Sequence, residues 1–291
     1  MYDKQTNKQT NKQTNKQTNK QTNKQTNKQT NKQTNSIILA ADSRFATQLI
    51  TTIKSICYHN THLRFYVLNR DFPTEWFDYL NRYLNQIECH IYDIKVNCEE
   101  IKHYTTFEHI ASDSTFFRYF IPQFLADEIT LYLDCDVIVN GNLDMLYQVD
   151  LKDNFVGAVV DPINPAEFNA GVLLINNQRW KAENITQKAM AYHQTHSEQI
   201  KNGADQYVLN ALFRPHWQPL HPYVNYQLGL DFVNQYQADL IEDIGEDIPL
   251  ILHYNTAAKP WLPGYPMRFR HFYWHYHNLE WRSIIERHQP H

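Results

Sequence analysis

Two aspartates separated by one residue lie between two apolar runs. Asp134 and Asp136 follow Leu131-Tyr-Leu and precede Val137-Ile-Val. In extended backbone, side chains at i and i+2 point to the same side. Two carboxylates placed in this way can share one hard divalent cation, which is a common means of holding a nucleotide diphosphate. The alternative is an acidic turn after a buried strand. The motif alone does not decide between a metal site and such a turn, because short motifs often occur without the function.

Other polar residues also follow apolar runs. Asp42, Asp161 and His253 each stand at the end of such a run, and Lys259 lies six residues past His253, just before Pro260. Two carboxylates and an imidazole suit Mn²⁺ better than Mg²⁺, which prefers all-oxygen ligands. A nearby Lys can neutralise phosphate oxygens as a point charge. Each residue alone could have an ordinary structural or surface role, but their joint placement at predicted strand ends favours a functional site.

The elements that must position these residues alternate along the chain. Apolar runs predict strands at 36–42, 63–68, 89–94, 129–133, 155–160, 168–177 and 248–253. Helical spacing predicts helices at 45–58, 73–87, 112–125 (kinked or ended by Pro122), 178–196 and 204–213, whereas 215–227 is predicted to be irregular. This alternation indicates βαβ units in an α/β fold with a mainly parallel sheet. Because ligands bind beyond the carboxyl ends of such strands, Asp42 and Asp134 are expected at one rim.

The first 35 residues differ from the rest of the chain. The tetrapeptide Lys-Gln-Thr-Asn occurs eight times without a break from Lys4 to Asn35, with no apolar residue to bury, and is therefore expected to be disordered. Eight Lys and one Asp give this tract +7 of the formal charge of −4, so the remainder carries −11. An acidic body argues against nucleic acid as the main partner.

The repeat also suggests a property of the gene. Lys, Gln, Thr and Asn can be encoded by the tetranucleotide AAAC read in successive triplets. We therefore hypothesise a slippage tract that switches translation on and off. Met1 precedes the tract and the next methionine is Met145, beyond the Asp pair, so no internal start could restore the site. Such phase variation would suit a product that modifies a bacterial cell surface.

Cysteine usage and hydropathy bear on the compartment. The four cysteines, Cys57, Cys89, Cys98 and Cys135, form neither a CxxC pair nor a metal-finger spacing. We interpret them as reduced thiols of a cytoplasmic protein. No signal peptide is evident and no apolar run approaches the length of a membrane span.

Residues 36–265 resemble, in one collinear order, the retaining glycosyltransferases of family eight, the group of glycogenin and the bacterial lipopolysaccharide α-galactosyltransferases and α-glucosyltransferases. The motifs that carry the resemblance are Ile38-Leu-Ala-Ala-Asp42, Phe116-Phe-Arg-Tyr, Leu131-Tyr-Leu-Asp-Cys-Asp136, Phe168-Asn-Ala-Gly-Val-Leu-Leu-Ile-Asn176, Asp205-Gln206 and His253-Tyr-Asn-Thr-Ala-Ala-Lys-Pro-Trp261. The resemblance implies a single nucleotide-binding domain of the Rossmann-like GT-A type at 36–265, with a mixed, mainly parallel sheet. The repeat tract at 1–35 precedes it, and an aromatic and basic tail at 266–291, helical in part, follows it.

The resemblance also implies how a nucleotide sugar is held. Asp134, Asp136 and His253 would bind Mn²⁺, or alternatively Mg²⁺, against the diphosphate of a UDP-sugar, and Lys259 would contact that diphosphate. Asp42 would reach the base or ribose of the uridine. The other residues implied at the nucleotide are Ala40, Ala41 and Cys135.

A third set of residues is implied around the donor hexose. Gln206 would lie nearest the back of the anomeric carbon. In this family no carboxylate is an accepted nucleophile, and the favoured picture is front-face attack by the acceptor hydroxyl, helped by the leaving phosphate. The hexose is expected to be galactose or glucose, and the acceptor a lipid-linked oligosaccharide of lipopolysaccharide or lipooligosaccharide. The implied catalytic residues are Asp161, Asn169, Asp205 and Gln206, and Arg118 would also contact the donor.

The C-terminal tail allows two interpretations. Residues 267–277 are dense in aromatic and cationic side chains, and Trp281, Ile284 and Ile285 fall on one helical face. This pattern is typical of peripheral attachment to an anionic inner membrane, where a lipid-linked acceptor would lie. The alternative is a C-terminal helix that packs on the domain.

Two rival functions remain at this stage. In a haloacid-dehalogenase-like phosphatase, Asp134 would be the nucleophile and Asp136 the acid/base, with Asp243 and Asp247 as a distal metal site. That motif normally lies near the start of a domain, and the rival leaves the segment 253–261 unexplained. The other rival is a sugar-binding protein with a decayed active site, which the 19 Tyr, 15 Phe and 6 Trp would suit. Every presumed metal and phosphate position is filled, which argues against decay.

Overall fold

The chain is described by a computed structural model that covers residues 34–99, 101, 104, 112–200, 203–229, 247–265 and 267–289. The backbone divides into two units, Met1–Thr34 and Asn35–His291. The repeat tract up to residue 33 lies outside the described residues, so its expected disorder stays a prediction.

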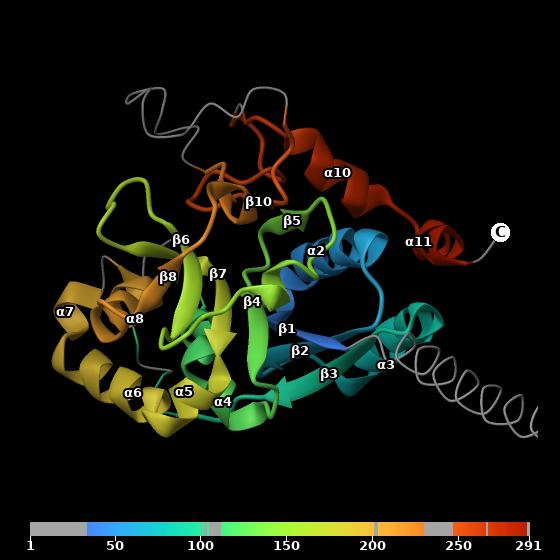
Figure 1. Cartoon of the computed structure of the whole chain (residues 1–291). Coiled ribbons are helices and arrows are strands. Elements are labelled where there is room, and N and C mark those ends of the chain that lie inside the picture. The colour runs from blue at the N-terminus through green and yellow to red at the C-terminus, as the bar shows by residue number, and fades with distance from the viewer. Residues whose placement is uncertain are drawn as a thin grey trace, which may run out of the picture. The chain divides into compact units, whose positions relative to one another are not determined.

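A seven-stranded mixed sheet forms the centre of the second unit (Figure 1). Its strand order is β3-β2-β1-β4-β7-β6-β8, with β7 antiparallel to both β4 and β6 and the other pairs parallel. The expected α/β fold with a mixed, mainly parallel sheet is therefore confirmed. Its strands are β1 (Asn35–Ala40), β2 (Leu63–Asn69), β3 (His90–Lys95), β4 (Ile129–Leu133), β6 (Val156–Val160), β7 (Phe168–Asn176) and β8 (Trp217–Pro219).

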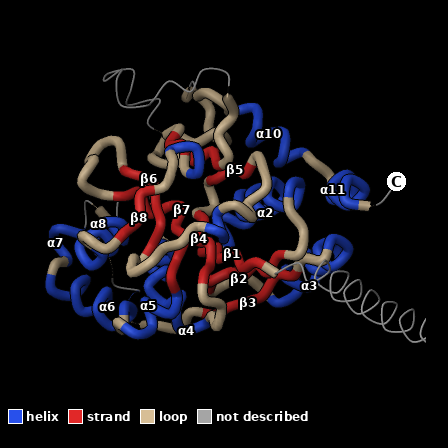
Figure 2. Tube along the Cα trace, in the orientation of Figure 1, coloured by secondary structure: helices blue, strands red, loops and turns tan. Residues whose placement is uncertain are grey.

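Helices cover both faces of this sheet (Figure 2). Successive residues of a strand point to opposite faces, so Ile37 and Leu39 pack on one side with α2 and α3, whereas Ile38 packs on the other. Both faces are apolar, as a parallel sheet between two helical layers requires. The helices are α2 (Ala46–His59), α3 (Thr74–Leu84), α4 (Ile121–Phe124), α5 (Asn177–Ala182), α6 (Ile185–Thr195), α7 (Ser197–Ile200) and α8 (Ala204–Phe213).

A small second sheet was not expected. It has the order β5-β10-β9 and comprises β5 (Val137–Val139), β9 (Tyr226–Gln227) and β10 (Ile251–His253). The predicted strand at 248–253 is therefore shorter and lies outside the main sheet. The segment 215–227, predicted to be irregular, contributes β8 and β9. These strands were not predicted because two or three residues are too few to show an alternation of apolar and polar side chains.

Two predicted helices have different boundaries. The helix expected at 178–196 is divided at Asn184, whose backbone is left-handed (φ 52°), a conformation that Asn adopts more easily than most residues. The helix expected at 112–125 begins as a 3-10 helix, η4 (Asp113–Phe120), and continues as α4, where Pro122 occupies the first turn and does not break it. Further 3-10 helices are η1 (Ser43–Phe45), η2 (Asn85–Ile87), η5 (Leu146–Gln148) and η6 (Pro222–Val224).

The C-terminal residues form α10 (Arg270–Asn278) and α11 (Trp281–His288), which pack against α2. Trp281, Ile284 and Ile285 are at most 7% exposed and belong to the core between α2, α3 and the main sheet. The apolar face that suggested membrane attachment is thus covered by the domain itself. This is the packing expected from the alternative interpretation of the tail.

Candidate metal and nucleotide-sugar site

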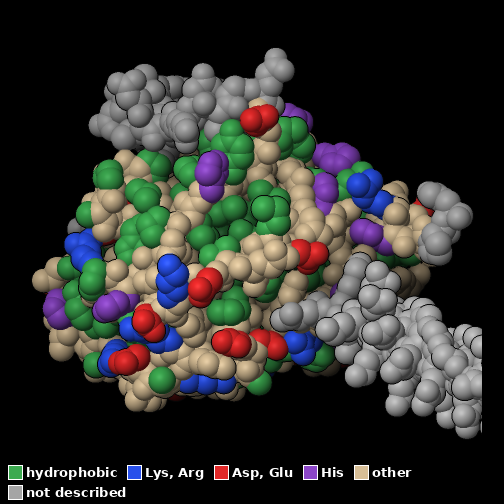
Figure 3. Space-filling view, in the orientation of Figure 1, with side chains coloured by type: hydrophobic (Ala, Val, Ile, Leu, Met, Phe, Trp, Pro, Cys, Tyr) green, Lys and Arg blue, Asp and Glu red, His purple; other side chains and the backbone are tan. Residues whose placement is uncertain are grey.

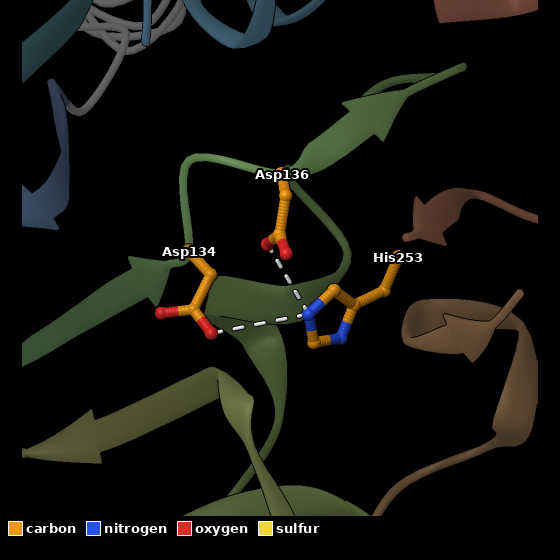
Figure 4. Close-up of side chains that lie close together, drawn as sticks. All are labelled: Asp134, Asp136 and His253. Atoms are coloured by element: carbon orange, nitrogen blue, oxygen red, sulfur yellow. Dashed lines mark ion pairs between the residues drawn. The ribbon is translucent and has the colours of Figure 1, made fainter. Parts of the chain in front are cut away.

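Three potential metal ligands converge where the two sheets meet (Figure 4). Asp134 and Asp136 follow β4, and His253 ends β10. One ligand atom from each lies within 4.8 Å of the other two. His253 Nε2 is 3.3 Å from Asp136 Oδ1 and 3.8 Å from Asp134 Oδ2. Residues over a hundred positions apart therefore present a nitrogen and two oxygens to one point.

The i, i+2 spacing predicted extended backbone for the two aspartates, and this prediction is wrong. Cys135 and Asp136 form a turn between β4 and β5, and the Asp134 amide donates to Gly171 O at 2.8 Å. Thr52 on α2 fixes the turn by donating to the carbonyls of Cys135 and Val137. The carboxylates converge because the chain bends back toward β10, which places the imidazole between them.

Cys135 fills a small buried space beneath the turn. Its side chain is 8% exposed and Sγ donates to Ala40 O at 3.3 Å, which links the ends of β4 and β1. Burial, together with the charges of Asp134 and Asp136, raises the pKa of this thiol. The structure therefore gives Cys135 a packing role as a protonated thiol, and its contact with the nucleotide stays a prediction.

The residues present fit a divalent cation. Asp136 Oδ1 is buried and accepts no hydrogen bond from the described residues, although His253 Nε2 lies nearby. Gly171 lets His253 and Asp134 approach the backbone of β7 closely, because a Cβ there would lie 2.2 Å from His253 Cε1 and 2.7 Å from Asp134 Oδ2. Buried charges are normally paired or bound to metals. A buried carboxylate oxygen without a hydrogen bond, with an imidazole nitrogen and a second carboxylate nearby, is an arrangement that an ion would complete.

Lys259 balances part of this negative charge. Its Nζ lies 2.5 Å from Asp136 Oδ2 and donates to Tyr254 O at 2.8 Å. Burial alone would raise the pKa of Asp136, but the charge and the hydrogen bond of the Lys259 ammonium oppose it, and the pKa is held below its usual range. Asp136 is therefore ionised across the physiological range, as a metal ligand must be.

We call Asp134, Asp136, His253 and Lys259 the metal side of the site. Arg118 joins this side to a further carboxylate, that of Asp205. It is 4% exposed, lies on η4, and places Nη2 2.9 Å from Asp134 Oδ1 and Nε 2.8 Å from Asp205 Oδ2. Tyr132 also donates to Asp134 Oδ1, at 2.7 Å. One oxygen of Asp134 is thus held within the protein, which leaves Oδ2 directed at His253.

We call the residues predicted around the hexose, Arg118, Asp161, Asn169, Asp205 and Gln206, the hexose side of the site. Three of them, Asp161, Asn169 and Gln206, form a hydrogen-bonded row. Gln206 at the start of α8 donates from Nε2 to Asp161 Oδ2 at 2.7 Å, and its Oε1 accepts from the Ala170 amide at 3.1 Å. Asn169 on β7 donates to the same Oε1 at 3.3 Å. The sequence predicted that these residues act together, and the structure brings them together; their individual roles stay predictions.

The predicted nucleotide residues lie at the end of β1. Asp42 caps η1 by accepting from the Arg44 amide at 3.0 Å and also pairs with the Arg44 guanidinium at 2.6 Å. Burial alone would raise the pKa of Asp42, but the hydrogen bonds with Arg44 and Ser112 lower it overall. Ala40 and Ala41 are adjacent, and Ala40 contacts Cys135 beside the metal side chains.

Sequence reasoning missed Asn225, which lies in the segment predicted to be irregular. Its Oδ1 is 2.8 Å from His253 Nδ1, and its Nδ2 donates to Asn169 Oδ1 at 2.9 Å. Tyr132 was missed because it lies inside an apolar run. Only the three-dimensional structure brings these side chains to the site.

Comparison with known proteins agrees with this geometry. Residues 36–263 match the family described as glycosyl transferase family 8, and the chain belongs to that family. Glycosyltransferases GlyA and GlyE of Streptococcus pneumoniae are 39% and 37% identical to it, over 88% and 86% of the chain. The chain spans only 36% of the length of GlyA and 62% of that of GlyE.

Solved structures show the same fold. The crystal structure of GlyE has a TM-score of 0.78 at 36% identity, with 87% of this chain and 62% of that chain covered. A structure of the galactosyltransferase LgtC in complex with donor and acceptor sugar analogs has a TM-score of 0.73 at 25% identity, covering 86% of this chain and 99% of that one. The expected family and GT-A-type fold are thereby confirmed.

These findings decide against the phosphatase rival. A haloacid-dehalogenase-like site has no role for His253, yet here its Nε2 faces both aspartates (Figure 4). Asp243, invoked as part of the distal metal site, lies outside the described residues. Separately, none of the described helices has both the length and the apolar character that crossing a membrane requires.

Proposed function

We propose that the chain transfers galactose or glucose from a UDP-sugar to a saccharide acceptor with retention of anomeric configuration, using Mn²⁺ held by Asp134, Asp136 and His253. One observation carries the proposal: three ligand atoms lie within 4.8 Å of one another, at the strand ends where a nucleotide is expected. The nitrogen ligand favours Mn²⁺ over Mg²⁺.

The residues of the metal side would assist the leaving group. When bound, the ion would act as a Lewis acid that stabilises negative charge on the departing diphosphate. Lys259 lies close enough to Asp136 to reach the same diphosphate, where its ammonium would neutralise further charge. His253 is buried and the Asp136 side chain is only 16% exposed, and this low exposure would strengthen these interactions.

The hexose side supports retention without a carboxylate nucleophile. Asp205 is 4% exposed and is bound to Arg118 and Thr115, while Asp161 accepts from Gln206 and from the Ile163 amide. Gln206 is an amide with both ends engaged. In our proposal these groups orient the hexose, and the acceptor hydroxyl attacks from the face that the diphosphate leaves.

The acceptor and its location form the outer part of the proposal. The solved structure of galactosyltransferase LgtC with donor and acceptor sugar analogs supports a saccharide acceptor. Hydrophobic side chains gather across the middle of one face of the molecule (Figure 3), a kind of surface on which sugar rings can pack. We propose a cytoplasmic enzyme that modifies a lipid-linked oligosaccharide of lipopolysaccharide or lipooligosaccharide type, switched by its repeat tract. Any inner-membrane contact of the tail would use residues other than the buried Trp281, Ile284 and Ile285.

The test measures release of UDP from a panel of UDP-sugars, with and without Mn²⁺. We expect Mn²⁺-dependent release from UDP-galactose or UDP-glucose, and a fall of at least about 100-fold in Asp136→Asn and His253→Ala. Full activity in both variants would refute the metal assignment. Absence of release from every UDP-sugar would favour the sugar-binding alternative.

A further inference from the structure

Asn225 hydrogen-bonds both His253 and Asn169, and so connects His253 directly to the row of hexose-side amides. It is 1% exposed and directly precedes β9, the neighbour of β10. Its two amide atoms face different partners, His253 Nδ1 at 2.8 Å and Asn169 Oδ1 at 2.9 Å. A buried amide with both ends bonded is rigidly oriented, so its direction has consequences for the histidine.

The direction of the row is set at the end far from the metal side chains. The Asp161 carboxylate can only accept, so Gln206 must turn Nε2 toward it, at 2.7 Å. Gln206 Oε1 then faces the Ala170 amide, which can only donate, at 3.1 Å. Both ends of Gln206 therefore agree on one orientation.

The same logic continues through Asn169. Its Nδ2 donates to Gln206 Oε1, and its Oδ1 accepts from the Gly171 amide at 3.0 Å. Because Asn169 Oδ1 is an acceptor, Asn225 must present Nδ2 to it and direct Oδ1 toward His253. A carbonyl oxygen can only accept, so His253 Nδ1 must carry a hydrogen.

We propose that Asn225 is a positioning residue that keeps the hydrogen of His253 on Nδ1, so that Nε2 is the nitrogen available to a divalent cation. The proposal rests on the proposed function, since the cation and the hexose belong to one reaction. Metal-bound histidines generally donate their other N–H to a fixed acceptor, and losing that acceptor typically weakens metal binding about 10- to 100-fold. Here the acceptor is itself fixed by residues that face the hexose, which couples the two halves of the site.

Two substitutions separate the two bonds of Asn225. Asn225→Leu removes both. Asn225→Asp keeps an acceptor for His253 Nδ1 but replaces the donor to Asn169 with an oxygen that faces another oxygen. Asn177→Leu is the matched control, because Asn177 is also 1% exposed and donates two hydrogen bonds, to Asp127 O and Thr130 Oγ1, outside the site.

Binding of Mn²⁺ to the full chain, measured by electron paramagnetic resonance without any UDP-sugar, is the first readout. We expect affinity to fall about 10- to 100-fold in Asn225→Leu and to stay within about threefold of wild type in Asn225→Asp and Asn177→Leu. In Asn225→Asp, kcat for UDP release should still fall about tenfold with little change in KM, because Asn169 loses its support. Equal affinity in Asn225→Leu and wild type, equal losses in the Leu and Asp variants, or no Mn²⁺ binding by the wild type would each overturn the proposal.

A second readout does not depend on whether Asn225→Leu folds. Nitrogen-15 spectra of histidine-labelled, metal-free wild-type protein at pH 8.5, with His253→Gln used for assignment, should show hydrogen on Nδ1 of His253. Finding Nδ1 without hydrogen would overturn the proposal. If the predicted pattern of Mn²⁺ binding appears but no UDP-sugar is consumed, the inference stands and the proposed function fails.

Discussion

The metal side and the hexose side of the site use the same kinds of residue in opposite ways. On the hexose side, Asp205 is paired with the permanent charge of Arg118 and accepts from Thr115 through Oδ1, although its Oδ2 accepts no hydrogen bond from the described residues. On the metal side, Asp136 Oδ1 is also buried without a hydrogen bond from the described residues, and His253 and Asp134 pack directly on Gly171. The unsatisfied oxygen of Asp205 thus has a permanent counter-charge beside it, whereas Asp136 Oδ1 has the imidazole of His253. We therefore expect the first group to act as a scaffold and the second to be completed by a ligand. Substitutions should therefore reduce stability on one side and affinity on the other.

The largest effect is expected from Arg118→Leu. Removing the guanidinium leaves Asp205, 4% exposed, without its counter-charge, and breaking a buried ion pair from one side costs about 3 to 5 kcal/mol. Burial already raises the pKa of Asp205 despite the opposing effect of Arg118, so this carboxylate depends on its partner. Urea unfolding measures the loss. Asp136→Asn is the comparison from the metal side and should cost less than Arg118→Leu, because the Asn oxygen can still accept from Lys259, whose ammonium is partly exposed and also donates to Tyr254 O. Equal losses in both variants would contradict the distinction.

Gly171→Ala tests whether the close packing of His253 and Asp134 on Gly171 is needed for metal binding. The new Cβ would lie 2.2 Å from His253 Cε1, so the imidazole and Asp134 must move apart. A displacement of about 1 Å can cost about 100-fold, and we expect at least that loss of Mn²⁺ affinity by titration calorimetry. Gly157→Ala, on neighbouring β6, is the control: its Cβ would meet Leu151 Cδ2 at 3.0 Å and should leave Mn²⁺ affinity unchanged. Normal Mn²⁺ binding by Gly171→Ala would mean that the ion lies elsewhere.

Lys259→Met sharpens the role of the internal cation. Lys259 lies 2.5 Å from Asp136 Oδ2, where in the proposed function it would compete with an incoming divalent ion and later contact the diphosphate. Its loss should tighten Mn²⁺ binding at least about threefold without nucleotide and weaken UDP binding about tenfold, roughly 1.4 kcal/mol. Lys188→Met, which removes an exposed ion pair with Glu183, controls for net charge. Calorimetry with Mn²⁺ alone and then with UDP distinguishes the two effects, and a change of the same sign in both would refute the competition.

How far the sequence could predict this site depends on where each residue lies. Asp134, Asp136 and Asp42 follow strands whose apolar runs are visible in the chain, so their shared rim was predictable from parallel topology. The turn at Cys135 was not, because it depends on Thr52 of a distant helix donating to its carbonyls. Asn225 was missed because β9 is two residues long and has no periodicity to detect. Contacts between segments remote in sequence carry no local signal.

Two buried histidines make the smallest but most direct contrast. His193 and His253 are each 2% exposed, but His193 stacks on Tyr104 at 3.5 Å between ring centroids and faces Phe116, whereas His253 faces two carboxylates. Burial lowers the pKa of His193 from its usual value of 6.5 to about 4. Between those values the unfolded chain binds the proton first, so stability is fully present above pH 6.5 and is lost as the pH falls toward 4.

We expect His193 to account for about 1 kcal/mol of the stability lost between pH 7.5 and 5, less than the full linkage because the Tyr119 hydroxyl beside Nδ1 can accept from a charged ring. Urea unfolding of His193→Phe at the two pH values should show that much less pH dependence than the wild type. Its Mn²⁺ affinity at pH 7.5 should equal that of the wild type, whereas His253→Ala should lose the ion. If His193→Phe impaired Mn²⁺ binding as strongly, burial of an imidazole rather than its position between Asp134 and Asp136 would be what matters. That result would contradict the distinction between residues that stabilise the fold and residues that bind the ion.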